Sequence, residues 1–130
     1  MDRSAILRGG LLAGVTIAVG LALPTERAYE LLALLLALAA GVYVGFGIAD
    51  ASAGEVRLQW LVALLFICLA ALGLWISPLL LAAGWMLHAG WDWLHHGRVL
   101  RTRAPGGYPA LCAVYDVIVG LFVLVLFAFS

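Results

Sequence analysis

The sequence predicts an all-α integral membrane protein, with five transmembrane helices in a single domain over residues 1–130. Two observations lead to this prediction. The chain is 66% hydrophobic and 11% charged, and its mean hydropathy of +1.15 is too high for a soluble domain of this size. The apolar residues also fall into five runs, each long enough to cross about 30 Å of hydrocarbon as a helix.

The ends of these runs coincide with charges, prolines and glycines. The predicted spans are residues 6–23, 29–49, 56–76, 78–96 and 108–129. Pro24 ends the first helix, and Thr25 is a candidate cap for the second. Ser77 is a candidate cap for the fourth helix, whose first turn suits Pro78. A basic loop separates the fourth helix from the fifth.

The arginines predict the orientation. Five spans put the two termini on opposite sides of the membrane, and positive charge marks the cytoplasmic side. An N-terminus in the cytoplasm places six of the seven arginines there and leaves only Arg27 opposite. The six are Arg3, Arg8, Arg57, Arg98, Arg101 and Arg103. We therefore expect a multi-pass protein of a bacterial inner (cytoplasmic) membrane.

Charge and small residues bear on the partners of the chain. The net charge is zero and there is no basic tail, so nucleic acid is not an expected partner and the lipid bilayer is. Gly10 and Gly14 form one small-xxx-small motif, and Gly41 and Gly45 form another. We interpret these motifs as packing seams within the chain, with a dimer face as the alternative. Because the bundle has only five short helices, we also expect a homodimer.

All three histidines lie in one apolar segment, which is the central feature of the sequence. At about 100° per residue, His88, Asp92 and His95 share one face of the fourth helix, and His96 lies one turn beyond Asp92. Asp116 lies about two turns into the fifth helix, at the same depth as His88. Potential ligands from two helices are therefore expected on one level of the bundle.

Charged groups at membrane depth are costly and normally have partners. Imidazoles and carboxylates at this spacing suit a divalent metal, zinc first, with iron or manganese as alternatives. The predicted ligands are His88, Asp92, His95, His96 and Asp116. The alternative is that Asp92 and Asp116 pair with protonated histidine, Tyr115 or loop arginines and only fasten the helices together.

Other polar residues at the same end complete the predicted site. Glu55, at the start of the third helix, and Asp116 are the expected catalytic residues that move a proton. Arg98, Arg101 and Arg103 are explained by membrane orientation and contact with anionic headgroups. As part of an active site, they would instead hold a phosphate or carboxylate of the substrate over the inner mouth of the bundle.

These features favour a metal-dependent membrane enzyme, a hydrolase acting on a lipid or other apolar substrate near the cytoplasmic leaflet. The metal would lower the pKa of a bound water toward neutrality. A small proton- or cation-coupled transporter is the second hypothesis, and a non-catalytic protein whose histidines hold haem or another cofactor is the third. The outer half of the predicted bundle is largely apolar, which counts against a path through the membrane.

The pattern His88-Ala89-Gly90-Trp91-Asp92-x-x-His95-His96, followed by Cys112-Ala113-Val114-Tyr115-Asp116, resembles a family of small bacterial multi-spanning membrane proteins of unknown function. The resemblance extends over most of the chain and implies no activity. More distantly, Asp92-x-x-His95-His96 resembles the HxxHH box of integral-membrane fatty-acid hydroxylases and desaturases, which use many more histidines. Membrane hydrolases of the ceramidase and adiponectin-receptor type are similar in combining embedded His and Asp at a zinc, on seven helices.

Overall fold

The computed structural model of the chain describes residues 2–50 and 53–130. Within these residues it contains five α-helices and no strand, as the sequence predicted. The helices are α1 (Arg3–Ala22), α2 (Thr25–Ala49), α3 (Ala53–Trp75), α4 (Pro78–His96) and α5 (Tyr108–Phe129). The predicted bounds of α4 and α5 agree with the structure, whereas the first three helices begin three or four residues earlier than predicted.

Of the two predicted helix caps, the structure contains one. Ser77 caps α4 as predicted, because its side chain accepts a hydrogen bond of 3.3 Å from the N–H of Leu79, and Pro78 occupies the first turn. The prediction that Thr25 caps α2 is wrong. Pro24 occupies the cap position with an extended backbone and no side-chain hydrogen bond, and Thr25 is already helical.

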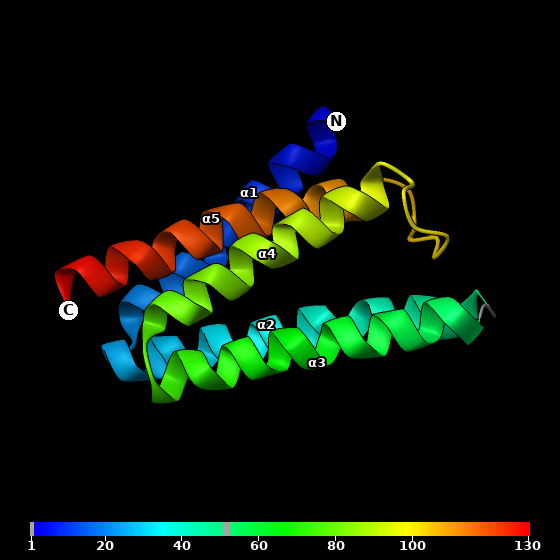
Figure 1. The fold of residues 1–130 in the computed structure, drawn as a ribbon. Coiled ribbons are helices and arrows are strands. Elements are labelled where there is room, and N and C mark those ends of the chain that lie inside the picture. The colour runs from blue at the N-terminus through cyan, green and yellow to red at the C-terminus, as the bar shows by residue number, and fades with distance from the viewer. Residues whose placement is uncertain (1, 51–52) are drawn as a thin grey trace.

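The helices pack side by side as a bundle (Figure 1). Successive neighbours follow the order α1, α5, α4, α3 and α2, and α2 also contacts α1, α4 and α5. The N-terminus and the loop of residues 97–107 lie at one end of the bundle, which we name the loop end. The α1–α2 and α3–α4 connections and the C-terminus lie at the opposite end, the turn end.

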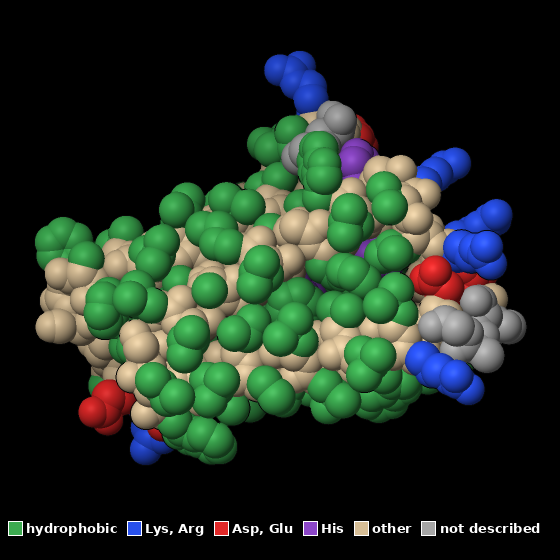
Figure 2. All heavy atoms as spheres, in the orientation of Figure 1, with side chains coloured by type: hydrophobic (Ala, Val, Ile, Leu, Met, Phe, Trp, Pro, Cys, Tyr) green, Lys and Arg blue, Asp and Glu red, His purple; other side chains and the backbone are tan. Residues whose placement is uncertain are grey.

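The surface of the bundle is that of a membrane protein. Among the described residues, α1, α2, α5 and residues Glu55–Trp75 of α3 are long and apolar enough to cross a membrane. The fourth helix is long enough but carries His88, Asp92, His95 and His96 within 19 residues. Hydrophobic side chains cover the middle of the visible face, and charged side chains gather at its two ends (Figure 2).

Close helix contacts involve other glycines than those in the predicted motifs. A Cβ at Gly9 of α1 would overlap the carbonyl oxygen of Leu111 in α5, and a Cβ at Gly84 would lie 2.7 Å from Leu36 Cδ2. By contrast, a Cβ would meet nothing within 4 Å at Gly10, Gly14, Gly41 or Gly45. The interpretation of these four glycines as seams within the chain is therefore wrong, and the homodimer stays a prediction.

We expect Gly9→Ala to destabilise the protein by about 1–3 kcal/mol, because the added methyl would push α1 away from α5. Gly10→Ala is the matched control, since its methyl enters open space and alanine favours a helix. Thermal unfolding of the two variants in the same detergent measures the difference. Equal stability of the two would contradict the close contact between α1 and α5.

Candidate functional site

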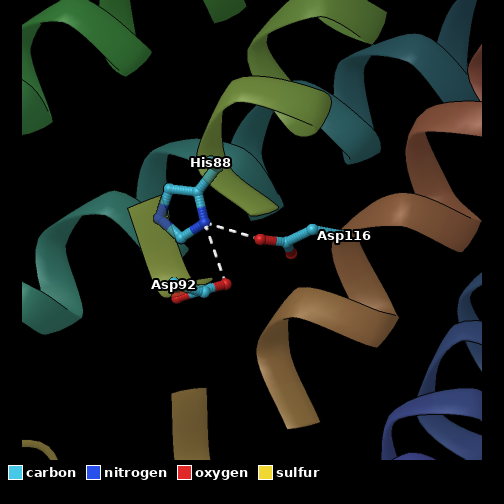
Figure 3. A group of neighbouring side chains, drawn as sticks. All are labelled: His88, Asp92 and Asp116. Carbon is cyan, nitrogen blue, oxygen red and sulfur yellow. Dashed lines mark hydrogen bonds and ion pairs between the residues drawn. The ribbon is translucent and has the colours of Figure 1, made fainter. Parts of the chain in front are cut away.

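Three of the predicted site residues meet inside the bundle (Figure 3). His88 Nδ1 lies 2.6 Å from Asp116 Oδ2 and 3.6 Å from Asp92 Oδ2. One potential ligand atom from each residue lies within 4.8 Å of the other two. All three side chains are buried, with exposed fractions of 2% for His88, 0% for Asp92 and 1% for Asp116. We name these three residues the buried cluster.

The contact between α4 and α5 places Asp116 against His88. Gly120 follows Asp116 by about one turn, and a Cβ there would lie 3.2 Å from side-chain atoms of Trp85 and Met86. A larger residue at this position would therefore hold the two helices apart. The lack of a side chain at Gly120 lets α5 approach α4 closely enough for a hydrogen bond across the interface.

Two other helices close the buried cluster from its opposite side. Tyr43 of α2 donates a hydrogen bond of 2.5 Å from its hydroxyl to Asp92 Oδ1. The ring of Phe66 in α3 packs edge-on against His88, with 4.8 Å between the ring centroids. Both side chains are buried. Four helices therefore enclose the cluster and separate it from solvent and lipid.

The buried cluster would carry more negative than positive charge with both carboxyl groups ionised. Two carboxylates and one imidazole then have a net charge of −1 if His88 is protonated and −2 if it is neutral. Lysine is absent from the sequence, all seven arginines are exposed, and none of the described ones forms an ion pair with Asp92 or Asp116. An uncompensated charge in an apolar interior is strongly unfavourable. The cluster therefore requires a proton or a metal cation.

The hydrogen bonds within the cluster leave two polar atoms without a partner. The Nδ1 nitrogen of His88 can take part in one hydrogen bond, and its partner is Asp116, because Asp92 Oδ2 at 3.6 Å lies beyond hydrogen-bond distance. Asp92 Oδ2 and His88 Nε2 are consequently buried and unsatisfied. Such atoms are rare in folded proteins and often mark a site for an ion or a water.

The structure does not bring His95 into the buried cluster. Its Nδ1 donates to the carbonyl oxygen of Trp91 at 2.9 Å, so its Nε2 is free to accept a hydrogen bond of 3.0 Å from Gln59 Nε2. Its ring stacks on that of Tyr43, with 4.0 Å between the centroids. Since both nitrogens are engaged, His95 supports the cluster through Tyr43 and is not a ligand in this arrangement.

A hydrogen-bonded chain continues from His95 toward the loop end. Gln59 Nε2 also donates to Thr102 Oγ1 at 3.2 Å, and the Thr102 hydroxyl donates to Glu55 Oε2 at 3.0 Å. Glu55 is partly exposed, so the chain connects a surface carboxylate with the interior. Glu55 was among the predicted site residues, and Gln59 is recognisable in the sequence as a polar residue in an apolar helix. Thr102 was missed, because nothing in the loop sequence distinguishes it.

The remaining predicted residues lie outside the cluster. His96 is exposed, and its ring lies 5.4 Å from that of Trp93. Arg98, Arg101 and Arg103 are exposed at the loop end. Together with both histidines at the end of α4, they line a hollow of about 870 Å³ formed by the loop. The predicted headgroup residues therefore share one hollow, separate from the buried cluster.

Fold and site together define a helical membrane protein with a buried carboxylate–imidazole cluster. The chain belongs to a family of unknown function, DUF6010, which matches residues 4–128. The resemblance expected from the sequence is confirmed at the level of this family. Neither a search of curated proteins nor a search of solved structures found a match.

We expect His88→Ala to destabilise the protein by about 3–5 kcal/mol, because it leaves two buried carboxylates without their imidazole. Arg27→Ala is the control: the Arg27–Glu30 pair has the same 2.6 Å separation but is exposed, so its loss should not change stability measurably. Unfolding midpoints in detergent compare the two variants. If both substitutions lowered stability by a similar, small amount, the buried interactions of His88 would not contribute more to stability than an exposed ion pair.

Proposed function

We propose that this protein is a membrane-embedded metal-dependent enzyme, a hydrolase acting on a lipid or other apolar substrate. The observation that best supports this function is the convergence of two carboxyl groups and an imidazole in an apolar interior. A divalent cation would compensate the charge of these carboxyl groups in their ionised form. The donor set suits zinc, with iron or manganese as alternatives.

The separations within the cluster are close to those that a metal requires. With bonds of about 2.0–2.2 Å, two ligand atoms on one ion lie about 3–4 Å apart. The 3.6 Å between His88 Nδ1 and Asp92 Oδ2 falls in this range. The 2.6 Å to Asp116 would have to open by about 1 Å or less, which a small carboxylate rotation provides. The hydrogen bond from Tyr43 would fix the orientation of Asp92 as a ligand.

Three protein ligands would leave a coordination position for water, and a metal ion would make that water acidic enough to ionise near neutral pH. Asp116 is the proposed first proton acceptor. Glu55 lies at the surface end of the hydrogen-bonded chain through Thr102, Gln59 and His95, and is the proposed exchange point with solvent. At its inner end, His95 stacks on Tyr43, the donor to Asp92.

We further propose that α4 also crosses the membrane, so that the protein has five spans. The loop end is proposed to be cytoplasmic in a bacterial inner membrane. The polar residues that lower the hydropathy of α4 are buried in the bundle, namely His88, Asp92 and His95, whereas Leu87 and Trp93 are exposed. A membrane would therefore contact an apolar face of this helix. Six of the seven arginines belong to the half of the bundle at the loop end, which supports the proposed side.

A proton-coupled carrier is the second candidate. The 2.6 Å between His88 and Asp116 is a hydrogen-bond distance, so a proton could be the compensating cation. The core toward the turn end, however, contains apolar residues such as Leu32, Leu81 and Val123. The described polar chain thus leads inward from one end only, which favours an enzyme over a carrier.

We expect protein purified without chelator to carry a stoichiometric divalent metal, and Asp116→Asn to lose most of it, because the neutral amide is a much weaker ligand. Arg101→Ala is the control and should retain the metal, since this arginine is exposed in the loop. Elemental analysis of the three proteins measures the metal content. Wild-type protein without stoichiometric metal would refute the metal site and leave a proton as the compensating cation.

The proposed orientation predicts which positions are accessible from outside the cell. In a background that lacks Cys68 and Cys112, we expect a membrane-impermeant maleimide to label Ser130→Cys but not Arg101→Cys in intact cells. Both positions are exposed, so burial does not explain a difference. Permeabilised cells provide the control in which both should react. Labelling at 101 but not at 130 in intact cells would reverse the orientation.

A further inference from the structure

The hollow at the loop end has a strong positive charge. It is lined by Arg98, Arg101 and Arg103 and by one carboxylate, that of Asp50. Asp50 Oδ2 accepts a hydrogen bond of 3.1 Å from the backbone N–H of Arg103, so it holds the loop and not a guanidinium group. None of the three arginines forms an ion pair with any residue that the structure describes. Three arginines against one aspartate leave an excess of positive charge facing the hollow.

The backbone at Arg98 indicates that its side chain is needed there. The φ of Arg98 is +54°, and it has the only positive φ among the non-glycine residues described. It occupies the position after the C-cap of α4, where the N–H of Arg98 bonds to the His95 carbonyl and the N–H of Val99 bonds to the Leu94 carbonyl. Glycine is the usual residue at this position of a helix end. A strained arginine is tolerated where the side chain has a role.

An apolar groove of about 460 Å³ lies on the outer side of the contact between α4 and α5. Its lining includes Met86, Gly90 and Trp93 of α4 and Val114, Val117 and Ile118 of α5. Gly90 leaves the groove open, because a Cβ there would meet nothing within 4 Å. The groove adjoins the basic hollow: Trp93 lines the groove, His96 lines the hollow, and their rings are 5.4 Å apart.

We infer that the hollow and the groove together bind one anionic lipid, with the phosphate among the loop arginines and an acyl chain along α4 and α5. Charge complementarity identifies the headgroup, since the unpaired arginines match a phosphate. The apolar lining of the groove and the position of the groove between two membrane-facing helices identify its occupant as an acyl chain. That the protein binds a lipid here is independent of the metal. That this lipid is also the substrate of the enzyme rests on the proposed function.

Native mass spectrometry of the full chain, presented with equimolar dioleoylphosphatidylglycerol and dioleoylphosphatidylcholine, tests the site. We expect the wild type to retain one phosphatidylglycerol in preference. The triple variant Arg98→Gln/Arg101→Gln/Arg103→Gln should lower this preference by about tenfold or more. The triple variant Arg3→Gln/Arg8→Gln/Arg57→Gln removes three other exposed arginines from the same half of the bundle and should leave the preference unchanged. Equal losses in the two would show a general charge effect and overturn the site.

A second variant tests the groove separately. Gly90→Leu places a side chain in the groove, starting from a Cβ that meets nothing within 4 Å, and should weaken retention of phosphatidylglycerol while leaving the binding of inorganic phosphate at the loop unchanged. If Gly90→Leu has no effect and phosphate binds with the same dependence on the three arginines, the hollow is a site for free anions and the lipid inference is overturned. Repeating the measurement after treatment with EDTA separates the two proposals, because loss of the metal should not release the lipid.

Discussion

The burial of two carboxyl groups in an apolar bundle is the constraint on which the rest of the structure depends. These groups need an imidazole, a hydroxyl and a proton or cation, and the imidazole and the hydroxyl come from different helices. The cluster therefore constrains which face of α4 points inward, and Gly120 lets α5 approach closely enough to reach it. The aromatic rings of Tyr43 and Phe66 enclose it and so keep its electrostatic interactions strong.

Much of the fold and part of the site could be predicted from the sequence. Apolar runs bounded by Pro24 and Ser77 define the helices because a membrane imposes their length and composition. Helical spacing put His88 and Asp92 on one face, and equal depth placed Asp116 opposite them. Spacing within one helix could not reveal that Gln59 of the neighbouring α3 donates a hydrogen bond to Nε2 of His95. That contact depends on the rotation of one helix against another.

The glycines show the same limit of sequence patterns. Regular spacing, as at Gly10 and Gly14, places small residues on one face of a helix. It does not show whether another helix packs against that face. The glycines with close neighbours, such as Gly9 against the backbone of Leu111 and Gly84 against the side chain of Leu36, belong to no regular pattern, because each contacts a different helix. The helices also differ in how many neighbours they have, because α2 contacts all four others whereas α1 contacts only α2 and α5.

The polar composition of α4 also has a consequence for biogenesis. This helix carries an aspartate and three histidines, and polar groups of this kind oppose partitioning of a helix into lipid. Its inward face finds partners in Gln59 of α3 and Asp116 of α5. If α4 spans the membrane as proposed, it would enter the bilayer together with these neighbours and not alone.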